Sequence, residues 1–158
     1  MHPIFKFLIA ISLPLAVGAV SGAFTVSAIN GWYATLQKPW FNPPNWIFGP
    51  VWTLLYAMMG IAFFLVWKST ANESVRNQAM VLFLIQLTFN FFWSLIFFHW
   101  QQPGWAFLEI VLLWVLILIT ILQFGKISST AAWLMVPYIC WVSFASVLNF
   151  ALWRLNAG

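Results

Sequence analysis

The chain has 158 residues, of which 64% are hydrophobic and only 5% are charged, and its formal net charge is +4. Soluble domains usually carry about 25% charged residues, and a chain this short cannot enclose so much apolar surface in one water-soluble core. Six basic side chains do not make a nucleic-acid-binding surface. These totals predict an integral membrane protein and exclude a soluble domain and a nucleic-acid partner.

Five apolar runs follow one another along the chain: 4–29, 46–67, 79–100, 105–124 and 130–153. Each contains the ~20 residues that a helix needs to cross a ~30 Å hydrocarbon core, whereas a barrel strand needs only ~9–11 residues of alternating polarity. Short connections make neighbouring helices antiparallel. We therefore expect one all-α membrane domain over 1–158, folded as a bundle of five transmembrane helices.

The first run resembles a signal peptide, because Lys6 precedes it and 26–28 has the pattern of a cleavage site. Its apolar stretch is longer than such peptides have, so we expect a mature helix. Gly18 and Gly22 form a G-xxx-G pair that allows close helix approach, either within the bundle or at a dimer face. The single cysteine, Cys140, lies in an apolar run, where we expect a buried, inert thiol.

Four prolines and three tryptophans lie within seventeen residues that start in the first connector and run into the second helix: LQKPWFNPPNWIFGPVW at 36–52. Proline fixes φ and disfavours helix at the residue before it, so we expect 36–45 to be extended or turned. Pro50 falls in the first turns of the second helix, where a missing donor is tolerated. A stiff aromatic segment over the mouth of a helix bundle would make a lid.

Three runs each carry a stripe of aromatic, amide and small residues at helical spacing. Amides inside a membrane bond across helices in a packed interior, or they line a ligand cavity, and the spacing alone leaves both interpretations open. The stripes are Trp52, Tyr56 and Gly60; Gln86, Asn90, Trp93 and Phe97; and Pro137, Trp141, Ala145 and Asn149.

Glu109 is the sole acid within a run. Either the positive end of the helix dipole stabilises its carboxylate near the start of its helix, or the carboxylate pairs with Gln86, His99 or a tyrosine. The sequence has no second inward histidine for bis-histidine heme ligation, no C-x-x-C-H motif, and no nucleophile beside a base. We expect no metal site and no conventional catalytic group for hydrolysis or group transfer.

The segment WYATLQKPWFNPPNWIFGPVWTLLYAMMG at 32–60, with QLTFNFFW at 86–93, PYICWVSFASVLNF at 137–150 and WRLN at 153–156, closely resembles the tryptophan-rich sensory protein and translocator protein family, also called the peripheral-type benzodiazepine receptor family. The resemblance implies a multi-pass receptor, sensor or translocator, here of a bacterial cell membrane, which is often a homodimer. It also implies a cavity beneath the first connector that takes porphyrins, heme-like molecules and isoquinoline-carboxamide compounds, with no required cofactor.

By position, the resemblance assigns the ligand site to ten residues: Tyr33, Pro43, Pro44, Trp52, Tyr56, Asn90, Trp93, Trp141, Ala145 and Leu148. It implies an alternative function as well, a light- and oxygen-dependent degradation of porphyrin in which Trp52 and Trp141 are catalytic. Phe150 stands where the family's cholesterol-recognition pattern needs tyrosine, so we expect no sterol dependence.

A porphyrin is a flat apolar ring with acidic edges, which suits these residues. Facing indoles at Trp52 and Trp141 are expected to stack on the ring or to lie edge-on against it, and such aromatic contacts add ~0.5–1.5 kcal/mol each beyond burial. Ala145 leaves room for the plane, Asn90 bonds a polar edge, and Lys38 lies near the carboxylates. The ring needs no axial ligand, so we expect the metal-free porphyrin to bind at least as well as heme.

Overall fold

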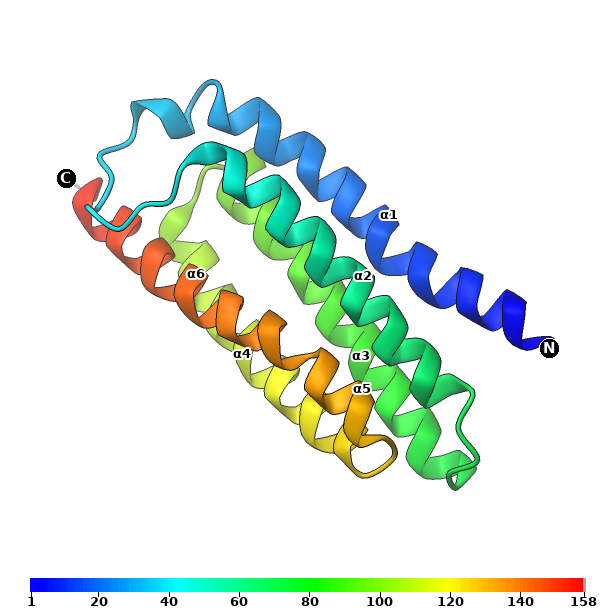
Figure 1. The fold of residues 1–158 in the computed structure, drawn as a ribbon. Coiled ribbons are helices and arrows are strands. Elements are labelled where there is room, and N and C mark those ends of the chain that lie inside the picture. Colours follow the sequence, from blue (N-terminus) through cyan, green and yellow to red (C-terminus); the bar gives the residue numbers. More distant parts are fainter. Residues whose placement is uncertain (158) are drawn as a thin grey trace.

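The computed structural model describes residues 1–157 and contains, within them, five helical segments long and apolar enough to cross a membrane (Figure 1). This confirms the prediction of a five-helix bundle, and the chain is a multi-pass integral membrane protein. The segments are α1 (Pro3–Ile29), α2 (Phe48–Trp67), α3 (Glu73–Ser94) with the π-helical turn η3 (Leu95–His99), α4 (Pro103–Gly125), and α5 (Ser129–Leu134) followed by α6 (Val136–Leu155).

The third segment begins earlier than the apolar run indicates. α3 starts at Glu73 rather than at residue 79, because the Asn72 side chain accepts a hydrogen bond from Ser74 N at 2.9 Å and caps the helix. The polar residues that follow belong to helix outside the apolar run. Hydropathy locates the part of a helix that lies in lipid, not the whole helix.

The fifth segment is divided at Met135, where α5 ends and α6 begins. Pro137 lies in the first turn of α6, where no backbone donor is needed. α5 packs against α2 and α4, whereas α6 packs mainly against α4. The single helix expected over 130–153 is therefore two helices, and the second leaves space beside α2.

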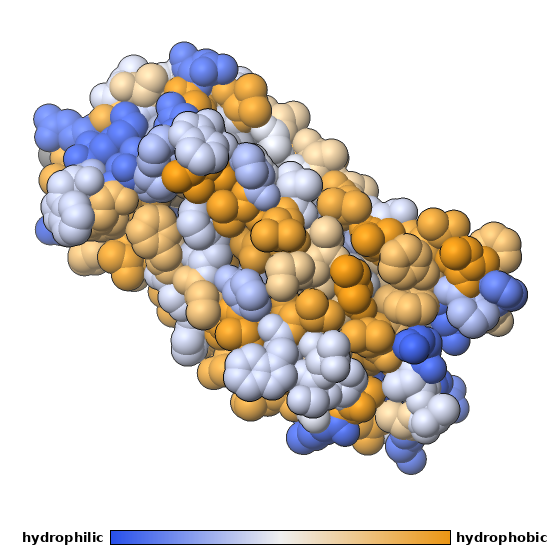
Figure 2. All heavy atoms as spheres, in the orientation of Figure 1, coloured by the Kyte–Doolittle hydropathy of each residue, from blue (hydrophilic) through white to orange (hydrophobic). Residues whose placement is uncertain are grey.

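The face of the bundle shown in Figure 2 is mostly apolar along its middle, and its hydrophilic residues gather towards the two ends. Many large apolar side chains are exposed on the outer surface of the bundle, as expected for a surface that lipid covers. Cys140 lies on this outer surface of α6 and is exposed, so the expectation of a buried thiol was wrong. Position within an apolar run does not tell which face of a helix a residue occupies.

A chain of hydrogen bonds ties α2, α3 and α6 together in the interior. Tyr56 OH donates to Asn90 Oδ1 at 2.6 Å, and Asn90 Nδ2 donates to Tyr138 OH at 2.8 Å. Tyr138 OH in turn donates to Gln86 Oε1 at 2.8 Å. Buried polar groups that pair in this way stabilise one arrangement of the helices.

A second tie joins α3, α6 and α4 nearer the first connector. Trp93 Nε1 donates to Asn149 Oδ1 at 2.9 Å, and Asn149 Nδ2 donates to Pro103 O at 2.8 Å. Asn149 thus accepts from an indole donor of α3 and donates to a backbone carbonyl in the first turn of α4. The amides at helical spacing do bond across helices, but they do not fill the whole interior.

Candidate functional site

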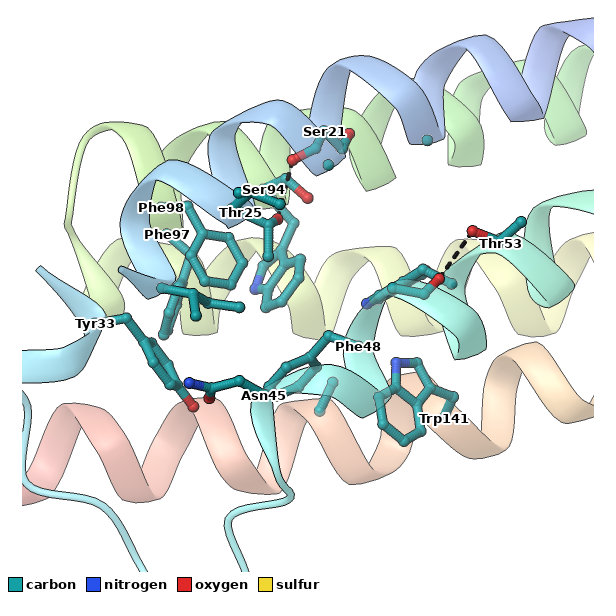
Figure 3. A pocket seen from close by; sticks show the side chains of 18 of the residues that line it. Ser21, Thr25, Tyr33, Asn45, Phe48, Thr53, Ser94, Phe97, Phe98 and Trp141 are labelled. Atoms are coloured by element: carbon teal, nitrogen blue, oxygen red, sulfur yellow. Dashed lines mark hydrogen bonds between the residues drawn. The ribbon is translucent and has the colours of Figure 1, made fainter. Parts of the chain in front are cut away.

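A cavity of about 510 Å³ lies between α1, α2, η3 and α6, close to the first connector (Figure 3). Its volume is in the range of small-molecule sites, ~300–1,000 Å³. Among the described residues, none of those that line it is charged. The lining is mostly aromatic and small: Leu15, Gly18, Ala19, Ser21, Gly22, Thr25, Val26, Ile29, Tyr33, Asn45, Trp46, Phe48, Gly49, Trp52, Thr53, Tyr56, Trp93, Ser94, Phe97, Phe98, Trp141, Phe144, Ala145, Leu148, Asn149 and Leu152.

Trp52 and Trp141 meet at one wall of the cavity. Their ring centroids are 6.5 Å apart and their planes lie at 87°, an edge-to-face contact. A flat ligand between two parallel indoles would need two stacking distances of about 3.5 Å, ~7 Å in all. The expected facing pair is therefore not what the structure shows, and a ring has to lie against the pair rather than between its members.

Two polar atoms of the lining are left without a partner. Trp141 Nε1 and Ser21 Oγ are buried, and neither has a hydrogen-bond partner within residues 1–157. A buried donor that makes no hydrogen bond costs about 1–3 kcal/mol. Both atoms therefore favour a ligand that brings a hydrogen-bonding group into a largely apolar cavity.

The first connector covers one end of the cavity through Tyr33, which is only 2% exposed. Its hydroxyl donates to Asn42 Oδ1 at 2.6 Å, and Lys38 Nζ lies 5.0 Å from the centroid of its ring. The ring also contacts Phe48 and Phe97 edge-on or tilted. Burial raises the pKa of Tyr33 to about 12, so the hydroxyl is neutral and donates at ordinary pH.

The connector is also fastened to the end of α6. Asn156 Nδ2 donates to Gln37 O, and Gln37 N donates to Asn156 Oδ1, each at 2.9 Å. This pair mimics one rung of a β-ladder between a side-chain amide and a backbone amide. The connector is thus held at two points, Tyr33 and Gln37. Figure 1 shows it passing over the end of the bundle where α6 ends.

Seven of the ten residues assigned from the sequence line the cavity: Tyr33, Trp52, Tyr56, Trp93, Trp141, Ala145 and Leu148. Asn90 is 1% exposed and lies behind Tyr56, and its amide is committed to Tyr56 and Tyr138. Pro43 and Pro44 belong to the connector and are not among the described residues that line the cavity. They shape the loop rather than the cavity wall.

The sequence reasoning missed the contribution of α1, which supplies Gly18, Ser21, Gly22 and Thr25. The signal was the G-xxx-G pair with polar neighbours, which we interpreted as a packing face. The helical stripe included Phe97, but the π-helical turn η3 and its Phe98, which closes the cavity beside Phe97, were missed (Figure 3). We found no sequence pattern that predicts the change from α- to π-helix, which determines how the Phe97 and Phe98 rings are oriented.

Glu109 is an acid with a buried carboxylate that makes none of the hydrogen bonds seen, among the described residues, for the amides of the interior. Both of its carboxylate oxygens are buried, and neither has a hydrogen-bond partner in the part of the chain that the structure describes. Gln86 Oε1 accepts a hydrogen bond from Tyr138 OH, and Gln86 Nε2 has no partner among those residues. None of the pairings expected for Glu109 is formed.

The sequence was compared with known proteins and families. The model of the TspO/MBR family matches residues 10–154. The chain is 46% identical to the tryptophan-rich protein TspO of Chlorobaculum tepidum, over 97% of each chain. It is 37% identical to the human translocator protein, over 99% of this chain and 91% of that one. It is also 34% identical to the tryptophan-rich sensory protein of Cereibacter sphaeroides, over 95% of this chain and 89% of that one. With five membrane-spanning helices and a match over nearly its whole length, the chain belongs to the TspO/MBR family.

Proposed function

We propose that the protein binds a porphyrin-like tetrapyrrole in the cavity and acts as a membrane sensor or carrier of it. The observation that supports this most is the uncharged, aromatic cavity with an unpartnered indole donor at Trp141 Nε1. Burying an apolar ring contributes about 2.5 kcal/mol for each ~100 Å² removed from water. The carboxylates of the ring would remain at the connector end, where Lys38 supplies a positive charge.

The lining residues favour a metal-free ring. None of the described residues that line the cavity is a histidine, cysteine or methionine. Tyrosine can also be an axial ligand of heme iron, but the hydroxyls of the two tyrosines in the lining, Tyr33 and Tyr56, donate to Asn42 and Asn90. Affinity then comes from burial and from contacts with the ring edge, which protoporphyrin and heme share. We expect protoporphyrin to bind as tightly as heme or more tightly, and much tighter binding of heme would contradict the proposal.

The test is a titration of the protein in nanodiscs with protoporphyrin, followed by quenching of tryptophan fluorescence. Trp141→Ala removes a cavity wall and its donor, and we expect it to weaken binding by at least about tenfold, or ~1.4 kcal/mol. Trp133→Ala is the matched control, because Trp133 is 70% exposed on α5 and outside the cavity. Asn90→Leu acts one layer behind the wall and should weaken binding less. Equal affinities for the parent and Trp141→Ala would overturn the proposed site.

A second candidate function is the oxidative degradation of the bound porphyrin in light. The contact between Trp52 and Trp141, at 6.5 Å, favours it, because two touching indoles beside a photoexcited ring can donate electrons while O₂ serves as the oxidant. Illumination in air should then yield a defined product that Trp52→Phe and Trp141→Phe do not form. The same product at the same rate from these variants would exclude the catalytic role.

A further inference from the structure

We infer that ligands reach the cavity sideways from the bilayer, through a gap between the halves of α1 and α2 that lie nearer the connector. This gap, called the window below, is bordered by Ala19, Gly22 and Val26 on α1 and by Gly49 and Thr53 on α2. The inference rests on the proposed function, because it concerns the route to that same cavity. It also narrows the ligand class to molecules that dissolve in the membrane.

The two helices touch closely on one side of the window. A Cβ added to Gly60 would lie 2.6 Å from Ile11 Cα, and one added to Gly18 would lie 2.5 Å from the Tyr56 ring. At Gly60 the neighbour is the backbone of α1, and at Gly18 it is the buried Tyr56 side chain, so neither point leaves room for a ligand to pass. From Gly60 to Gly18 the contact between α1 and α2 is therefore closed.

Beyond Gly18 the contact opens. A Cβ added to Gly22 or to Gly49 would meet no described atom within 4 Å outside its own stretch of helix, although both residues line the cavity. Gly22 lies one helical turn from Gly18, so the change is abrupt. The G-xxx-G pair thus has two roles: its first glycine closes the helix contact and its second leaves the window free.

The residues that border the window belong to the cavity and to the outer surface at once. Ala19, Gly49 and Thr53 are exposed, and Val26 is 62% exposed. Because these exposed residues also line the cavity, we place its opening here. Behind it lies Ser21, 4% exposed, whose Oγ has no hydrogen-bond partner among residues 1–157. The hydroxyl offers a polar group to a molecule that has come through the window.

The path from the aqueous side is more obstructed. Asn156 holds Gln37 by a pair of 2.9 Å hydrogen bonds, and the Tyr33 ring packs between Phe48 and Phe97. Opening this side requires breaking directed bonds and moving a buried ring. The window requires neither, so it is the lower barrier. A porphyrin with carboxylates all round its edge would dissolve poorly in hydrocarbon and should be admitted slowly.

Stopped-flow quenching by protoporphyrin IX in nanodiscs tests the route. Gly22→Leu and Thr53→Leu place bulk in the window. Ala23→Leu is the matched control, because Ala23 is the exposed neighbour of Gly22 and does not line the cavity. Asn156→Ala releases the connector from α6. Size-exclusion profiles establish that each variant is folded.

We expect Gly22→Leu and Thr53→Leu to slow both association and dissociation by about tenfold, because a blocked path raises one barrier in both directions. Ala23→Leu and Asn156→Ala should leave both rates unchanged. Weaker binding with faster dissociation in the window variants would overturn the inference, because it would make these residues part of the site alone. Faster exchange in Asn156→Ala with unchanged rates in the window variants would also overturn it, in favour of the aqueous path. Neither result would affect the proposed function, which fails only if the parent shows no saturable quenching.

Discussion

The closest approach of α1 and α2 depends on Gly60, and Gly60→Ala is the sharpest test of the packing. The added methyl carbon would lie 2.6 Å from Ile11 Cα and 3.0 Å from Ala10 O. Carbon atoms in contact are separated by about 3.5 Å, so α1 has to move away by roughly 1 Å. Both neighbours are backbone atoms, which cannot rotate aside as a side chain can. Overpacking of this kind costs about 1–3 kcal/mol.

Gly22→Ala provides the reference for this substitution. It makes the same chemical change in a neighbouring helix but meets open space, so the gain in helix propensity, about 1 kcal/mol, is common to both variants and cancels. We expect Gly60→Ala to unfold at a lower fraction of SDS than Gly22→Ala, with a difference of about 1–3 kcal/mol in free energy of unfolding. Identical unfolding curves would show that α1 and α2 are not in contact at this point.

Three further predictions concern the connector and the ties between helices. Burial raises the pKa of Tyr33 to about 12, against 10.0 for an ordinary tyrosine, so its contribution to stability is complete below pH 10 and is lost as pH rises through 12. Tyr33→Phe should therefore remove this part of the alkaline loss of thermal stability, together with the corresponding step in phenolate absorbance. An unchanged pH profile would contradict the assignment. Asn149→Leu leaves the buried Trp93 Nε1 without its acceptor and removes the bond to Pro103 O, so it should lower the free energy of unfolding by about 1–3 kcal/mol, whereas the exposed Asn77→Leu should not. Gly104→Ala would bring a methyl group to 2.9 Å from Trp153 Nε1, a side-chain atom that can move, so its SDS midpoint should fall less than that of Gly60→Ala; an equal or larger fall would refute this.

The number and type of helices could be predicted from the sequence because lipid imposes a length and a polarity on every crossing. The start of α3 and the division at Met135 could not be predicted. The start of α3 depends on a cap formed by Asn72, outside the apolar run. The division at Met135 depends on how α5 and α6 pack against different neighbours.

The site shows the same division between pattern and packing. Helical spacing placed Trp52, Tyr56, Trp93 and Trp141 on inward faces, and all four line the cavity. Spacing could not tell that Asn90 is committed to two tyrosines, or that Trp52 and Trp141 meet edge to face. Such details depend on the rotation of each helix and on the choice of rotamers, which no single segment determines.

The bonds between Gln37 and Asn156 join positions 119 residues apart. Because the N-terminal helices are synthesised first, the connector lacks its bonds to Asn156 until the final helix has entered the membrane. Until then the wall formed by α6 is also missing, and the nascent bundle is open on that side. The wall and the bonds that close the cavity at this end therefore form only after the last helix has been made.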